Sequence, residues 1–253
     1  MNGKGGLNSS FISRIWLCTN FNKMANSLIR LNQMIFLVVL ALVHLTSINA
    51  QSSWHTIFNG KNFKGWTKVG DSAPFAIKDG AILLHQKANT KEHSFLRTNR
   101  KYRNFILELD AKRDSLFYYG ILFRAIEAPD TAHVRMFGYQ VKVDHIATRR
   151  WTGGIYDDYG NTWNWLYPLT DNIPAQYALK PPGEWDHYRI EAIGDHIRTW
   201  LNGVPASDLI NRKYRNGYIA LKIHQLGGNA EMERYAGWVK NLKVTRMSVK
   251  EKD

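Results

Sequence analysis

The chain is almost devoid of cysteine. Cys18 is the single thiol among 253 residues, and it lies in an N-terminal segment that we expect to be removed. The mature protein would then hold no disulfide, no thiolate metal site and no cysteine nucleophile. The chain also lacks a glycine-rich phosphate loop, an H-E-x-x-H zinc pattern, a G-x-S-x-G elbow and an E-x-D-x-x-E run. These absences exclude the motif-bearing nucleotide, zinc-protease, serine-hydrolase and two-carboxylate glucanase classes.

Acidic residues are few, with 21 Asp and Glu against 34 Lys and Arg. Residues 1–50 hold four of the basic residues and no acidic one, so the rest of the chain carries 30 − 21 = +9 formal charges. A basic balance can indicate a nucleic-acid partner. The Lys and Arg residues are nevertheless scattered along the chain, without a dense run or a nucleic-acid motif. We therefore predict solvated basic faces and no nucleic-acid partner.

Only one long hydrophobic run is present, MIFLVVLALVHL at residues 34–45. Arg30 precedes this run, and small and polar residues follow it as far as Ala50. A basic start, an apolar core and a small residue at the end are typical of a secretory signal peptide. The run is shorter than the roughly 20 residues that a membrane span requires. We predict a secreted or periplasmic protein that is cleaved near Ala50, with no stable membrane span.

Residues 51–253 are then expected to form a single all-β domain. Short runs of alternating apolar and polar residues are separated by turn signals, such as Lys78-Asp79-Gly80 between two apolar runs. Such a pattern predicts a β-sandwich or barrel. Residues 157–184 interrupt the rhythm as a long aromatic loop, and 208–215 is the segment that most favours a short helix. Asp157 and Asp158 are read as turn residues, and as neighbours in a strand they would point apart, which excludes a glycosidase pair.

Alternation within the expected strands nominates a site. In the strand around residues 139–144, Tyr139, Val141 and Val143 should pack inward and leave Gln140, Lys142 and Asp144 on the other face. Applied to 119–124 and 218–224, the same rule adds more polar side chains to that face. Gly120 and Ala220 would leave room there for a ligand. Together the polar candidates are Arg124, Gln140, Lys142, Asp144, Lys222 and His224.

An ordered set of short motifs resembles the 3-keto-disaccharide hydrolase family, formerly a domain of unknown function (DUF1080). The first motifs are Phe58-Asn59-Gly60-Lys61 and Gly65-Trp66. Gly120–Arg124, Gly138–Val141, Thr152–Tyr156, Pro182–Trp185, Ile197–Pro205, Gly217–Leu221 and Val239–Leu242 follow in family order. The resemblance spans about residues 54–246. It implies a jelly-roll β-sandwich of two antiparallel sheets in the concanavalin A-like lectin and glucanase superfamily.

The resemblance also implies a saccharide or glycoside partner and the cleavage of 3-keto-glycosides. A base would remove the acidic C2 proton beside the ketone, the enolate would expel the aglycone, and water would then add. We expect His224 or Asp144 to be the base, Arg124 and Lys142 to stabilise the enolate, and Tyr156 or His145 to assist departure. Gln140 and Lys222 would bind the sugar, and Trp163 or Trp165 would stack on its ring.

Two alternatives stay open at this point. A divalent metal such as Ca²⁺ is conceivable at Asp144, His145 or His224, although their spacing does not demand one. The chain also departs from the usual family residues at Gln140 and Lys142. A non-catalytic, lectin-like glycan-binding module on the same fold is therefore the alternative function.

Overall fold

The computed structural model describes residues 32–34, 53–129, 134–144, 151–159 and 164–248. The chain divides into two units, Met1–Gln51 and Ser52–Asp253, and both β-sheets belong to the second unit. The proposed signal peptide therefore lies almost wholly outside the described residues, as do His145 and Trp163. No helix within the described part of the chain is long and apolar enough to span a bilayer.

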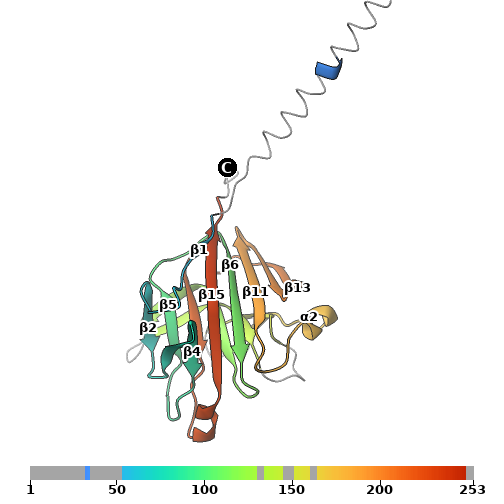
Figure 1. Ribbon diagram of the computed structural model, residues 1–253. Coiled ribbons are helices and arrows are strands. Elements are labelled where there is room, and N and C mark those ends of the chain that lie inside the picture. Colours follow the sequence, from blue (N-terminus) through green and yellow to red (C-terminus); the bar gives the residue numbers. More distant parts are fainter. Residues whose placement is uncertain (1–31, 35–52, 130–133, 145–150, 160–163, 249–253) are drawn as a thin grey trace, which may run out of the picture. The chain divides into compact units, whose positions relative to one another are not determined.

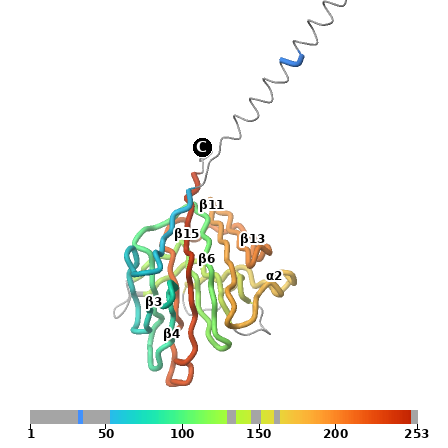
Figure 2. Tube along the Cα trace, viewed as in Figure 1, coloured from blue at the N-terminus to red at the C-terminus, as the bar shows by residue number. Residues whose placement is uncertain are grey.

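Two antiparallel sheets face each other as a sandwich (Figure 1), as the sequence pattern predicts. The first sheet is called the β15 sheet after its strand β15 (Ala236–Arg246). The short strand β1 (His55–Thr56) pairs with β15. Its strands are, in spatial order, β13 (Val204–Ile210), β12 (His196–Leu201), β11 (Asp186–Ile193), β6 (Phe105–Arg113), β15 (Ala236–Arg246), β4 (Ala81–His85) and β3 (Phe75–Lys78). Figure 2 traces β15 beside β6 in this sheet.

The second sheet, called the β8 sheet, contains the family-like segments around residues 120 and 140. Every strand pairing described in it is antiparallel. Its strands are, in spatial order, β10 (Asn164–Tyr167), β9 (Ile155–Asp157), β8 (Val134–Val143), β7 (Tyr119–Pro129), β14 (Tyr218–Ile223), β5 (Ser94–Thr98) and β2 (Trp66–Gly70).

The core lies between the inner faces of the two sheets and follows the predicted alternation. Tyr139, Val141 and Val143 of β8 join this core, and Leu107 of β6 and Val239 of β15 meet them from the other sheet. Alternate residues of these strands therefore face away from the core. The outward face of the β8 sheet is the one on which the polar candidates were predicted to gather.

Turn chemistry agrees with the sequence at the β3–β4 hairpin. Asp79 and Gly80 have φ values of 51° and 75°, and such a pair of positive angles is what a two-residue type I′ turn requires. Residues 157–184 differ from the predicted loop because they hold β10 and the short helix α2 (Ile173–Tyr177). The prediction of a helix at 208–215 is wrong, since β13 continues to Ile210. The other short helix is η1 (Ala230–Arg234).

Candidate functional site

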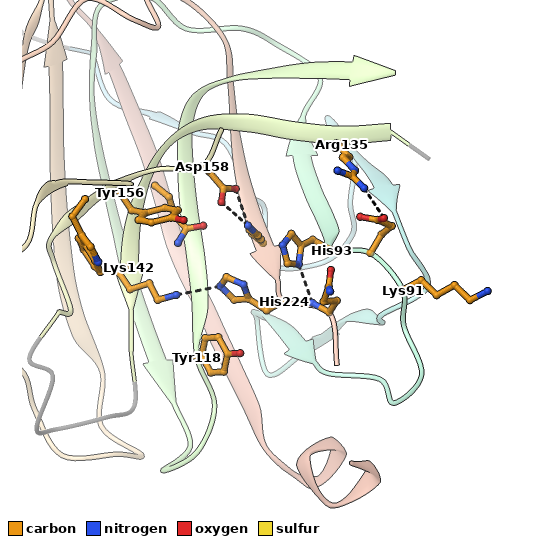
Figure 3. A pocket seen from close by; sticks show the side chains of 13 residues that line it. Lys91, His93, Tyr118, Arg135, Lys142, Tyr156, Asp158 and His224 are labelled. Carbon is orange, nitrogen blue, oxygen red and sulfur yellow. Dashed lines mark hydrogen bonds and ion pairs between the residues drawn. The ribbon is translucent and has the colours of Figure 1, made fainter. Parts of the chain in front are cut away.

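A cavity of about 410 Å³ opens on the outward face of the β8 sheet (Figure 3). Gln140 and Lys142 come from β8, Lys222 from β14, and His224 follows β14 directly. These strands bring the four side chains together because each pair occupies alternate positions on the same face. Further lining residues are Lys91, Glu92, His93, Tyr118, Arg135, Tyr156, Asp158, Trp165 and Gln225.

Lys142 and His224 form the centre of this cavity. The Lys142 Nζ lies 3.5 Å from His224 Nε2 and 5.0 Å from the centroid of the Tyr118 ring. The Tyr118 ring also packs against the His224 imidazole at a centroid distance of 4.8 Å. An ammonium group has no acceptor, so His224 Nε2 accepts in this contact and its ring keeps the proton on Nδ1. The geometry thus places a cation directly beside a basic ring nitrogen.

Both histidines of the cavity are held neutral. Burial lowers the pKa of His224 well below its ordinary value of 6.5, and the charges of Lys142 and Lys222 add to the shift. Burial, Lys222 and Lys142 lower the pKa of His93 to about 3. The backbone N–H of Gln225 donates to His93 Nδ1 at 2.9 Å. Near neutral pH the site therefore offers imidazole, not imidazolium.

A buried ion pair forms the wall above the histidines. Lys222 Nζ donates to both carboxylate oxygens of Asp158, at 2.6 and 2.8 Å, and the two side chains are 3% and 7% exposed. Burial raises the pKa of Asp158 and lowers that of Lys222, and the attraction within the pair opposes both shifts. Desolvation thus disfavours the charged form of each partner, and the attraction within the pair offsets that penalty.

Aromatic side chains close the side of the cavity near β9 and β10. The rings of Tyr156 and Trp165 meet edge to face at 5.6 Å, and Trp151 lies 5.0 Å from Trp165. Burial and the Asp158 carboxylate raise the pKa of Tyr156, so its phenol stays protonated and can donate. Across the cavity Arg135 pairs with Glu92 at 2.7 Å, while the Lys91 side chain points away (Figure 3).

Six of the ten predicted site residues line this cavity, namely Gln140, Lys142, Tyr156, Trp165, Lys222 and His224. His145 and Trp163 lie outside the described residues, so their roles stay predictions. Arg124 and Asp144 do not line it.

The placement of Arg124 on the site face is wrong because β7 contains a bulge. The pairing of β7 with β8 shifts between Phe123 and Ile126, and Arg124 has a φ of 48°. Its fully buried guanidinium donates to the carbonyl oxygens of Arg103 and Tyr214, at 2.8 and 3.2 Å. Arg124 therefore ties loops together and does not face the cavity.

Asp144 does not face the cavity as predicted, and Gly120 and Ala220 do not leave room for a ligand. Asp144 is 2% exposed, and its backbone N–H and carbonyl both bond the Thr152 hydroxyl, at 3.0 and 3.1 Å. A Cβ on Gly120 would lie 2.4 Å from Gln140 Cδ, so Gln140 fills the space above that glycine. Ala220 packs within an apolar cluster with Leu122 and is equally unavailable to a ligand.

The described residues do not assemble a metal site. No group of three or more His, Cys, Asp or Glu side chains within them could hold an ion. Asp144 and His224, two of the three predicted ligands, belong to different surroundings, since only His224 lines the cavity.

Sequence reasoning missed His93, Tyr118 and Asp158. His93 and Tyr118 immediately precede β5 and β7, where strand alternation gives no guidance. Asp157 ends β9 and accepts from the Tyr214 hydroxyl at 2.8 Å, whereas Asp158 turns to Lys222. The two carboxylates point apart as predicted, but one of them belongs to the site.

Solved structures with this fold include both binding modules and enzymes. The carbohydrate-binding module CBM66 of Bacillus subtilis has 15% identity and a TM-score of 0.51, over 72% of this chain and 95% of that chain. The kappa-carrageenase of Pseudoalteromonas carrageenovora, solved with an oligotetrasaccharide, has 11% identity and a TM-score of 0.53, over 79% and 98%. A galectin-like protein of Bacillus subtilis has 11% identity and a TM-score of 0.52, over 77% and 94%. At these identities the likeness establishes the fold.

The family is established by sequence. A comparison with curated proteins finds no match. The model of the 3-keto-alpha-glucoside-1,2-lyase-like domain, in contrast, matches residues 53–245, which is almost the whole sandwich. The match confirms the resemblance inferred from the ordered motifs. The chain therefore belongs to the 3-keto-alpha-glucoside-1,2-lyase-like family of carbohydrate-active domains.

Proposed function

We propose that the cavity on the β8 sheet cleaves 3-keto-glycosides by elimination followed by hydration. The observation that carries this proposal is the neutral His224 imidazole, 3.5 Å from the Lys142 ammonium within the cavity. In a 3-keto-glycoside the acidic C2–H and the C3 carbonyl are neighbours. A base and a cation side by side match this pair of groups.

The reaction balances without an oxidant or a reductant. His224 takes the proton from C2, and the electrons of that C–H bond form the C2–C3 double bond of an enolate. The enolate returns to the ketone, a C1–C2 double bond forms, and the C1–O bond breaks. The aglycone oxygen leaves with a proton. Water then adds its oxygen to C1 and a proton to C2, so that the net change is hydrolysis.

Each lining residue receives a role from its position. The Lys142 ammonium stabilises the developing enolate oxygen, and the neighbouring Tyr118 ring supports that cation. The protonated Tyr156 phenol donates to the departing oxygen. Trp165 offers a stacking surface for the ring, and Gln140 orients the sugar hydroxyls. The Asp158–Lys222 pair holds the wall in place and supplies a route for protons.

A chromogenic 3-keto-glucoside tests the activity directly. We expect the full chain to release the aglycone and His224→Ala to turn over at least about 100-fold more slowly. Asp144→Asn is the matched control, because Asp144 lies outside the cavity, and it should retain most activity. The rate should fall only at a pH well below 6.5, since His224 gains the proton that disables it as a base only below its lowered pKa. Full turnover by His224→Ala would refute the assignment of the base.

A glycan-binding module is the second candidate function. The paired rings of Trp151 and Trp165 beside the cavity favour it, since aromatic faces bind sugars without chemistry. A binder would hold the 3-keto-glucoside and leave it intact. An ordinary glycosidase would instead cleave unoxidised glucosides.

We also propose that the protein is exported, with cleavage near Ala50. The apolar run at 34–45 and the small residues after it support this proposal. N-terminal sequencing of the protein recovered outside the cytoplasm would test it, and an intact N-terminus there would contradict it.

A further inference from the structure

We infer that one end of the sandwich is a docking surface for anionic phospholipid. Cations that are scattered in the sequence gather there in space. Arg100, Lys101 and Arg103 lie in the loop between β5 and β6, and Arg246 ends β15. All four are exposed, and together they line one hollow. These four residues are called the basic end, and none of the described residues that line its hollow is acidic.

A rigid frame presents these cations. The backbone N–H of Tyr102 donates to the Gly217 carbonyl at 2.7 Å, and the Gly217 N–H donates back at 3.1 Å. The Met247 N–H donates a hydrogen bond to the Asn104 carbonyl oxygen at 3.0 Å. Loop and strand are thus fixed to one another, and the backbone that carries the four cations needs no rearrangement when they meet a partner.

The point at which the chain enters the sandwich indicates the partner. His55 of β1 pairs antiparallel with Val244 of β15, so Trp54 lies next to the end of β15 that carries Arg246. Trp54 is 37% exposed, and the Lys243 ammonium lies 4.8 Å from its ring. Exposed Trp with Lys and Arg is the composition that favours a membrane interface, and nothing comparable favours duplex nucleic acid.

The cavity faces a different part of the fold. The basic end follows Thr98 of β5, whereas His93 precedes Ser94 at the other end of that strand. In the neighbouring β14, Tyr218 begins near the basic end and His224 follows the last residue. The strand length separates the two regions by roughly 17 Å. Docking at the basic end would therefore leave the cavity accessible to saccharide, whether that cavity cleaves its ligand or only binds it.

Vesicle sedimentation with the processed protein, cleaved near Ala50, tests the inference. Vesicles of phosphatidylcholine alone are compared with vesicles in which one third of the lipid is phosphatidylglycerol, at low and high salt. The two kinds of vesicle differ only in their headgroup charge, so the difference between them reports electrostatic docking. We expect stronger binding to the anionic vesicles, and this excess should disappear at high salt.

Charge reversal locates the surface. The triple variant Arg100→Glu, Lys101→Glu, Arg103→Glu should lose the anionic excess by roughly tenfold or more. The control carries the same reversal at Lys61, Lys78 and Lys87, which are exposed and lie outside the hollow. It should retain most of the excess. Equal losses in the two variants, or no anionic excess in the native chain, would overturn the inference. Salt-sensitive binding to duplex DNA without any preference for phosphatidylglycerol would overturn it as well.

Discussion

Removing the Asp158 carboxylate should be among the most damaging single changes in the domain. In Asp158→Asn the Lys222 ammonium, now 2% exposed, would lose both of its charge-assisted hydrogen bonds, at 2.6 and 2.8 Å. Breaking a buried ion pair from one side costs about 3–5 kcal/mol. For a domain of this size each kcal/mol lowers Tm by about 2–4 °C, so we expect a fall of roughly 6–20 °C.

A double variant distinguishes the contribution of the ion pair to stability from its contribution to activity. Asp158→Asn with Lys222→Met leaves no unpaired charge in the wall, and replacing both members of a buried pair is often nearly neutral. We therefore expect the double variant to regain most of the free energy of unfolding that the single variant loses. The same double variant removes the proposed proton route, so its rate should stay low although its stability recovers.

Urea unfolding followed by tryptophan fluorescence measures these free energies of unfolding, provided that the dependence of the free energy on urea concentration is the same in all variants. Asp208→Asn is the matched control, because that carboxylate is 66% exposed and pairs with His196 at the surface. Its loss should stay within about 1 kcal/mol. A loss in Asp158→Asn as small as that of the control, or a double variant no more stable than the single one, would refute the reasoning.

Three further predictions concern the same cavity. The folded pKa of His93 is about 3 and its unfolded value is near 6.5, so the unfolded chain binds the extra proton between them. Stability should fall as the pH is lowered through that window, by up to about 1.4 kcal/mol per unit, and a flat series of urea midpoints would contradict the shift. Gly120→Ala should displace the Gln140 amide and raise KM several-fold, whereas an unchanged KM would show that this amide does not contact the sugar. Trp165→Ala should weaken saccharide binding by roughly tenfold in calorimetric titration, and undiminished affinity would exclude stacking there.

Alternation predicted the part of the site that regular strands supply. Gln140, Lys142 and Lys222 lie where a period of two places them, and the core positions between them are buried. The same rule failed at Arg124, because a bulge adds a residue to β7 and reverses the direction of the side chain. A bulge depends on the partner strand, and one sequence read alone carries little signal for it.

The remaining site residues depend on contacts between distant segments. Asp158 meets Lys222 across 64 positions of sequence, and His93 meets His224 only because β5 and β14 are neighbours. Local patterns give the strands but not the order in which the strands pair. The family motifs were enough to predict the fold. The side chains that meet in the cavity could be identified only from the pairing of the strands.

The alternating roles along β8 have a consequence for how such proteins diversify. Tyr139, Val141 and Val143 pack in the core, whereas Gln140 and Lys142 line the cavity. Substitutions at Gln140 and Lys142 can therefore alter the polar groups of the cavity without touching the core contacts of Tyr139, Val141 and Val143.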